Sequence, residues 1–396
     1  MEQSASGILV SAATAQSKPK GVSRLLFIDN IKVYLTFLVI THHLMIIYAG
    51  SGNWPYYTEG RQDIITNSLG GWYCATNQAY FMGLFLLIGA YFVPGSYDRK
   101  GAWRFLKDRL IRLGIPLTVY SWIINPLFVY FILYRNQMPI WRFFPGRYFS
   151  GGEYLGQGPL WFVETLLIFS LVYVLWRFIV RPQTAKPAGE ARFPRNGSIA
   201  FLALILGVAG FLVRTVFIMD TDRLLALNLQ IPFFVQYIAL FIIGLTAFRR
   251  NWFQSLPDKT GRLWLIIAGI LILFWAPMMI FNGAIDGSTL NKGGWHWQSL
   301  VYTLWESFLC FSMCIGLVYA FRRYFNRQNR ISSFLTSNAY TAYLIHAPVI
   351  TFLALAVQDI TIYPFLKWAV VAVVVVPLCF GISALIRKVP YTDRVL

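Results

Sequence analysis

Ten apolar stretches alternate with polar connections along the chain, and each is almost free of charge. A helix rises 1.5 Å per residue, so about 20 apolar residues cross the roughly 30 Å hydrocarbon core of a bilayer. The pattern therefore predicts an all-α fold, a polytopic transmembrane bundle of about ten helices. The predicted spans are 31–50, 72–94, 113–134, 159–176, 198–218, 230–248, 263–282, 299–321, 340–357 and 365–386.

Composition agrees with this class, because 57% of the residues are hydrophobic and only 13% are charged. Soluble domains carry about a quarter charged residues. The formal net charge of +18 could by itself suggest a nucleic-acid partner. The distribution of the basic residues along the chain argues against that partner.

Most of the 34 Lys and Arg residues fall in the cytoplasmic connections if the N-terminus is placed in the cytoplasm. This is the asymmetry that the positive-inside rule expects. The exceptions are Arg61, Arg135, Arg142, Arg147, Arg223, Lys292 and Lys367 on the opposite side, and Arg214 within a span. The sequence thus predicts an integral protein of the cytoplasmic membrane with both termini in the cytoplasm, surrounded by lipid and binding no nucleic acid.

No connection is long enough to form a separate soluble domain. Residues 1–23 are predicted to be a disordered cytoplasmic tail, 24–390 the transmembrane domain and 391–396 a cytoplasmic C-terminal tail. The connection 95–112 is unusual because basic residues recur in it at helical spacing beside apolar ones. It is predicted to form an amphipathic helix at the cytoplasmic interface that stops before Pro116.

The cysteines do not suggest a metal site or a disulfide framework. All four fall within predicted spans, and they lack the spacing of a metal-binding motif. We interpret them as small apolar packing residues, and no metal is expected. They are Cys74, Cys310, Cys314 and Cys379.

Ionisable residues within the spans carry the functional information, since each costs roughly 2.5–3.5 kcal/mol at the bilayer centre. A chain that tolerates several of them is expected to enclose a polar cavity between its helices. These residues are His42, His43, Glu164, Arg214, Glu306 and His346.

The first span places three polar residues on one helical face. Lys32 and His43 are separated by eleven positions, which is only about 20° more than three full turns, and His43 lies about 16 Å further along the axis. Asp29 falls within about 40° of the same face, whereas His42 points about 100° away from His43. A cation at the mouth with an imidazole at mid-membrane suits an anionic cofactor that threads inward. The alternative is that Lys32 is a positive-inside anchor and His43 a hydrogen-bonded packing residue.

The remaining ionisable residues allow more than one role. Glu164 and Glu306 are candidate catalytic residues that could orient a histidine or accept a substrate hydroxyl, but either could instead pair with Arg214. A structural contact of this kind is at least as favoured for each. His346 lies about one and a half turns inside its predicted span, where a packing or interfacial role is favoured.

Several motifs match one family in the right order. "FIDNIKVYLTFLVITHH" resembles the first helix of the acyltransferase 3 family of membrane acyltransferases, in which Leu-Asp-x-Leu-Arg is followed by ten residues and His. Asp29, Lys32 and His43 take the Asp, Arg and His positions. Four further segments match. "GAYFVPGSY" is similar to the family's Ser-Gly-Tyr-Phe segment and "RLIRLGIP" to its Arg-x-x-Arg-Leu-x-x-Pro segment. "GPLWFVETLLIF" is similar to the Leu-Trp-Phe segment and "AYTAYLIHAPVI" to the Tyr-Leu-x-His-x-Pro segment.

The resemblance implies an acyltransferase that moves an acyl group, usually acetyl, from cytoplasmic acyl-CoA to a hydroxyl, often on a carbohydrate. The branch that adds succinyl groups to glucans is also similar. The resemblance makes His43 the candidate catalytic residue, and Arg109 and Arg112 candidate contacts of acyl-CoA. Lys32 departs from the pattern, because lysine keeps the charge of the usual arginine but loses its planar bidentate fork.

A secondary transporter or exporter of a small polar or anionic solute is the competing class, and a sensor or assembly factor without chemistry is a third. A transporter would predict inverted repeats and broken helices at matching positions in two halves, which the sequence does not show. The acceptor is not identified by the sequence. Aromatic residues near the outer face could stack on sugar rings, although a membrane-interface belt explains them as well or better. They are Trp54, Tyr56, Tyr57, Trp295 and Trp297.

Overall fold

The computed structural model describes residues 24–49, 52, 54, 57–59, 63–148, 156–180, 192–219, 223–224, 229–284, 287–392 and 395–396. The predicted tail at 1–23, most of the 177–197 connection and Tyr56 lie outside these residues.

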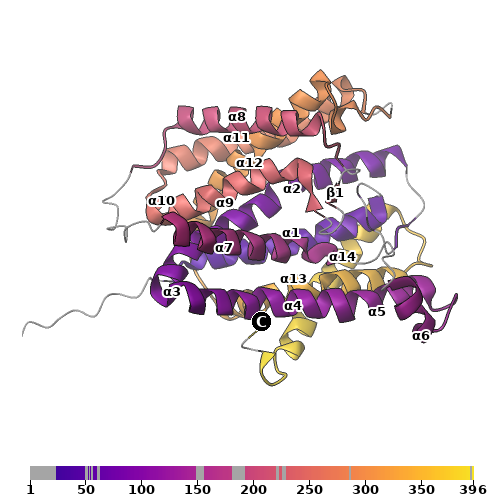
Figure 1. Ribbon diagram of the computed structural model, residues 1–396. Coiled ribbons are helices and arrows are strands. Elements are labelled where there is room, and N and C mark those ends of the chain that lie inside the picture. Colours follow the sequence, from indigo (N-terminus) through magenta and orange to yellow (C-terminus); the bar gives the residue numbers. More distant parts are fainter. Residues whose placement is uncertain are drawn as a thin grey trace, which may run out of the picture.

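Long helices make up nearly all of the described chain (Figure 1). The α-helices are α1 (Leu26–Ala49), α2 (Ile64–Tyr91), α3 (Val93–Arg109), α4 (Ile115–Val119), α5 (Asn125–Val129), α6 (Ile140–Phe143), α7 (Trp161–Val180), α8 (Asn196–Arg214), α9 (Phe234–Arg249), α10 (Trp252–Ser255), α11 (Asp258–Phe281), α12 (Trp297–Tyr324), α13 (Arg330–Ala356) and α14 (Pro364–Ile386). The π-helical turns are η1 (Leu110–Gly114), η2 (Tyr120–Ile124), η3 (Tyr130–Tyr134) and η4 (Phe144–Tyr148), and the 3₁₀ turns are η5 (Gly158–Leu160), η6 (Ile231–Phe233) and η8 (Leu290–Lys292). One short antiparallel pair joins β1 (Arg223–Leu224) to β2 (Leu229–Gln230).

The structure confirms the predicted all-α bundle. Within the described residues, nine helical segments are long and apolar enough to cross a membrane. Each matches one predicted span, and the remaining span, 72–94, matches α2, which is 28 residues long but more polar. α2 packs against α1, α9 and α12 in the middle of the bundle (Figure 1). Because its neighbours are protein rather than lipid, it can carry polar residues such as Asn77.

Several predicted boundaries differ from those of the helices, and α8 and α13 are two examples. α8 ends at Arg214, so the last residues of the predicted span 198–218 are not helical. α13 begins at Arg330, well before the predicted start at residue 340, and the side chain of Asn329 caps it by accepting a hydrogen bond from the backbone N–H of Ser332. The first turns of α13 are polar, so hydropathy alone could not reveal them.

The separate amphipathic helix predicted over 95–112 was also wrong. α3 bends at Gly101, where φ is 73°, and then continues through η1, α4, η2, α5 and η3 as one segment to Tyr134. Pro116 has no N–H to offer the carbonyl of Arg112. The chain accommodates it by forming the π-helical turn η1 just before it, and the hydroxyl of Tyr340 on α13 donates to that carbonyl at 2.6 Å.

Replacing Tyr340 with phenylalanine should lower the free energy of unfolding by about 1 kcal/mol, because the Arg112 carbonyl loses its hydrogen-bond donor. Thermal unfolding in detergent would measure the change. Tyr324→Phe is the matched control, since Tyr324 is 64% exposed at the end of α12. Equal melting temperatures for the two variants would contradict the assigned role of the hydroxyl.

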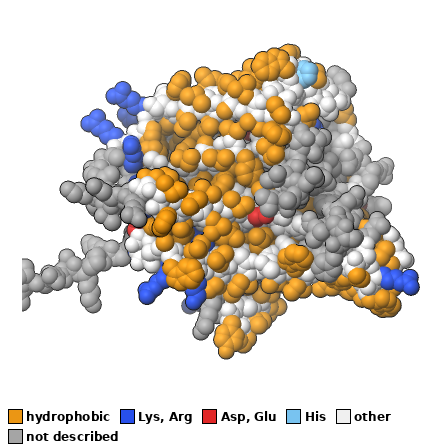
Figure 2. Space-filling view, in the orientation of Figure 1, with side chains coloured by type: hydrophobic (Ala, Val, Ile, Leu, Met, Phe, Trp, Pro, Cys, Tyr) orange, Lys and Arg blue, Asp and Glu red, His pale blue; other side chains and the backbone are white. Residues whose placement is uncertain are grey.

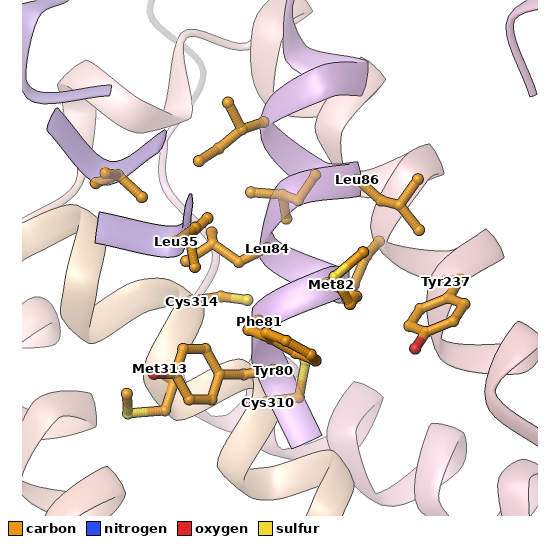
Figure 3. Packing of buried hydrophobic residues seen from close by; sticks show 14 of the residues in the cluster. Leu35, Tyr80, Phe81, Met82, Leu84, Leu86, Tyr237, Cys310, Met313 and Cys314 are labelled. Carbon is orange, nitrogen blue, oxygen red and sulfur yellow. The ribbon is translucent and has the colours of Figure 1, made fainter. Parts of the chain in front are cut away.

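The hydrophobic core lies along α2 (Figure 3). Leu84 on α2 points toward Leu35 on α1 and Cys314 on α12, while Met82 and Leu86 point toward α9 and its Tyr237. All of the labelled side chains are buried. This packing joins α1 to the rest of the bundle and so positions the polar residues that α1 carries.

Basic residues gather at one end of the bundle, which we call the basic end and define by Arg177, Arg249 and Arg322 at the ends of α7, α9 and α12. α1 begins there, since the side-chain amide of Asn30 donates to the carbonyl of Phe325 at 2.6 Å. Figure 2 shows Lys and Arg mainly toward the side where Figure 1 places α3 and α10, with hydrophobic side chains between the two ends. The opposite end, where α1 finishes, is called the far end.

Which end faces the cytoplasm stays a prediction from the positive-inside rule. Asp98 near the start of α3 links two of the basic residues, with its carboxylate 3.1 Å from Arg177 and 2.5 Å from Arg249. These contacts fasten α3, α7 and α9 together at the basic end.

Candidate active site

Two histidines from helices that are distant in the sequence meet inside the bundle. The Nδ1 atom of His43 on α1 lies 3.0 Å from the Nε2 atom of His346 on α13. Their rings are stacked with centroids 5.0 Å apart. His346 is fully buried and His43 is half-buried, so His43 is the member of the pair that a substrate can reach.

Hydrogen-bond partners determine where the protons of this pair lie. The Nδ1 atom of His346 contacts the carbonyl oxygen of Tyr343, which can only accept. Nδ1 of His346 therefore carries a hydrogen, and its Nε2 accepts from Nδ1–H of His43. The Nε2 atom of His43 is left unprotonated, and a nitrogen in that state can take a proton from a hydroxyl.

His346 lies in the middle of α13, not near its end as predicted, because the helix begins at Arg330. Tyr343 positions this part of the helix: its hydroxyl donates to the carbonyl of Pro159 at 2.6 Å, and its ring packs against Phe162. Sequence reasoning favoured a packing or interfacial role for His346. The contact with His43 distinguishes it from a packing residue.

The neighbouring His42 points in another direction, toward α2, as the helical geometry predicted, although the edge of one ring meets the other with the His42 and His43 centroids 5.5 Å apart. Its ring is 5% exposed and packs against Phe81 on α2 with centroids 4.9 Å apart. Its Nδ1 atom is buried and has no hydrogen-bond partner. His42 is thus a packing residue in this structure.

Trp54, which follows α1, covers His43 with its indole. The two ring centroids are 4.8 Å apart, and the indole is only 6% exposed. Sequence reasoning grouped Trp54 with interfacial aromatic residues, because nothing in the local pattern shows that the chain turns back toward His43 after α1.

Lys32 lies on the same helix as His43, toward the basic end. Its ammonium group is 3.3 Å from the carboxylate of Asp29, which also pairs with Arg24 at 2.7 Å. It lies 4.7 Å from the centre of the Phe92 ring. Lys32 therefore sits between the histidine pair and the residues around Phe92.

A cavity of about 290 Å³ opens beside Phe92 at the basic end. Arg109 and Arg112, both candidates from the sequence, line it together. Its other lining residues include two more cations of the 95–112 segment and several aromatic rings contributed by α2, α3 and α9. These are Arg99, Lys100, Tyr91, Phe92, Phe105 and Phe248, and the remaining lining residues are Gly95, Ser96 and Asp108. A cavity with four cations and partly exposed rings such as Phe92 suits a ligand that carries phosphates and an aromatic base.

The structure does not bring the two candidate glutamates to the histidines. Glu164 on α7 accepts a hydrogen bond from the side-chain amide of Gln157. Glu306 on α12 forms a buried ion pair with Arg214 at 2.6 Å, where the side chains are 7% and 1% exposed. Of the alternatives weighed for Glu306, the pairing with Arg214 is therefore the one that the structure contains.

Known proteins give a consistent comparison. A family profile described as an acyltransferase domain matches residues 25–384. The chain is 24% identical over 347 residues to a protein named "Glucans biosynthesis protein C" from Salmonella heidelberg (strain SL476), and the match covers 82% of each chain. The protein of the same name from Salmonella typhi matches with the same identity and coverage. No solved structure matches.

Proposed function

This chain belongs to the acyltransferase 3 family, and on that premise we propose that it carries an acyl group from acyl-CoA to a hydroxyl of a carbohydrate at the cytoplasmic membrane. The observation that carries the proposal is the order in which the candidate binding and catalytic groups lie along the bundle. The cationic cavity, Lys32 and the His43–His346 pair follow one another from the basic end toward the middle of the bundle.

The cavity at the basic end is the proposed site of the CoA head group. CoA carries a diphosphate and a 3′-phosphate, and Arg109 and Arg112 supply charged donors for them. The partly exposed rings of Phe92 and Phe248 offer faces on which an adenine base can stack. The thin pantetheine arm would then pass Lys32 and bring the thioester toward His43, about 16 Å further along α1.

His43 is the proposed general base. Its unprotonated Nε2 takes the proton of the acceptor hydroxyl while the hydroxyl oxygen attacks the thioester carbonyl. A C–O bond forms, the C–S bond breaks, and the proton passes to the departing thiolate of CoA. His346 acts through His43, because its Nε2 accepts from Nδ1–H and holds the ring in the reactive tautomer.

Acetyl is the proposed acyl group, with succinyl as the second candidate. The names of the two relatives favour a glucan as the acceptor. Mass spectrometry of envelope glucans from cells with and without the gene would identify both, through the mass that is lost with the gene.

The biochemical test uses purified protein in lipid vesicles with acetyl-CoA or succinyl-CoA, and a linear glucan oligosaccharide as the acceptor probe. Release of free CoA thiol together with an acylated oligosaccharide is expected. A transporter would leave the thioester intact, so the absence of thiol release with both donors would overturn the proposal.

Lys32→Gln is expected to raise the KM for acyl-CoA about tenfold, because a charge-assisted hydrogen bond contributes roughly 1.5 kcal/mol or more. Lys32→Arg should keep the wild-type KM, since the ammonium group of lysine and the guanidinium group of arginine can each contact a phosphate. Steady-state kinetics with the donor varied measures both. A Lys32→Gln variant with unchanged KM would remove Lys32 from the donor path.

A further inference from the structure

Trp54 closes the histidine pair on the side away from the cavity. α1 ends at Ala49, so Trp54 reaches His43 from the far end of the bundle. Its indole N–H donates to the hydroxyl of Thr351 on α13 at 3.2 Å, and that hydroxyl donates to the carbonyl of Ala347 at 2.9 Å. The indole therefore bridges the two helices that carry the two histidines.

A partly buried ion pair anchors Glu59, which follows Trp54 in the chain. The backbone N–H of Glu59 donates to the carbonyl of Ile47 on α1 at 3.0 Å, and its carboxylate lies 2.6 Å from the ammonium group of Lys367 on α14. Lys367 is 1% exposed and also donates to the carbonyl of Gln358 at 3.3 Å. Lys367 was one of the exceptions to the positive-inside pattern, and this pairing accounts for its charge at the far end.

A base that accepts a proton from a sugar hydroxyl can also accept one from water. In the first case the thioester yields a sugar ester and CoA thiol, and in the second a free carboxylic acid and CoA thiol. In both, the C–S bond breaks, a C–O bond forms, and the proton reaches the sulfur through His43. An enzyme at this branch point needs a group that keeps water from the base until the acceptor arrives.

We propose that Trp54 is this group, a positioning residue that covers His43 at the far end and directs the acyl group to a sugar hydroxyl rather than to water. The inference rests on the proposed acyl transfer. A sugar has apolar C–H faces that can lie against an indole ring, so the residue that excludes water also offers the acceptor a surface next to the base.

The test is acceptor-independent hydrolysis of acetyl-CoA by the purified full-length protein, followed by release of CoA thiol. Trp54→Ala is expected to raise the hydrolysis rate at least tenfold over wild type, and Trp54→Phe to raise it less. Thr351→Val, which keeps the side-chain shape but removes the hydrogen-bond acceptor, should raise it as well. Trp295→Ala is the matched control, because Trp295 is 75% exposed, and it should leave the rate unchanged.

The double variant His43→Ala, Trp54→Ala should show no hydrolysis, which would establish that the released thiol comes from the same base. Hydrolysis at the wild-type rate in Trp54→Ala and Thr351→Val would overturn the inference while leaving acyl transfer in place. If Trp54→Ala does not fold, Trp54→Phe and Thr351→Val decide the result. If the proposed function is wrong, the result differs, because neither the wild type nor any variant would then release CoA thiol.

Discussion

Replacing His43 with alanine is expected to reduce kcat for acyl transfer by about 10²–10⁴-fold, the range that a positioned general base contributes. The unprotonated Nε2 of His43 is the proton acceptor that the proposed mechanism needs, and His43 is the half-buried member of the pair, whereas His346 is fully buried. The KM for acyl-CoA should change little, because the head group binds at the basic end. Thiol release and product formation from purified protein would measure both constants.

His42→Leu is the control for this prediction. His42 is the adjacent histidine on the same helix, but it is buried against Phe81 and its Nδ1 has no hydrogen-bond partner. Exchanging an unpartnered buried polar group for an apolar one of similar size is close to neutral. Near-normal turnover in His43→Ala, with expression and membrane insertion intact, would reject His43 as the base.

Replacing His346 with leucine is expected to lower kcat by about 10²-fold or more with an unchanged KM for acyl-CoA. Leucine cannot accept the hydrogen bond from Nδ1–H of His43, so the ring loses the partner that selects its tautomer. Loss of the residue that orients a catalytic histidine costs up to about 10⁴-fold in the serine protease triad, which is the extreme of the range.

A conservative variant separates positioning from packing. The amide oxygen of His346→Gln can still accept from His43, so this variant should recover a large part of the activity lost in His346→Leu. Thermal unfolding of both variants in detergent controls for stability. Equal activity of the leucine and glutamine variants would show that His346 only fills space on α13.

The apolar pattern predicted the fold class well because each membrane span must satisfy its own backbone hydrogen bonds and present apolar side chains to lipid. Every predicted span corresponds to a long helical segment in the structure, although some boundaries differ. The pattern failed where a helix does not face lipid along its whole length. α13 starts in a polar stretch at Arg330, and α3 continues through Pro116 because a π-helical turn and Tyr340 compensate for the proline.

The residues of the candidate site also divide into those that the sequence could relate to one another and those that it could not. Lys32 and His43 share a face by helical geometry alone, so the sequence could relate them to each other. Arg109 and Arg112 were related through the Arg-x-x-Arg pattern that the chain shares with the family. Glu164 and Glu306 could not be placed, since their partners Gln157 and Arg214 depend on how helices pack.

The sequence by itself determined a bundle of about ten helices, the basic residues at their connections and the histidine eleven positions after Lys32, because local periodicity and hydropathy act within one helix. The tertiary structure alone decided that His346 from α13 and Trp54 from beyond α1 both meet His43. These contacts join residues on different segments of the chain, and only the packing of α1 against α13, α14 and α2 brings them within hydrogen-bonding and stacking distance.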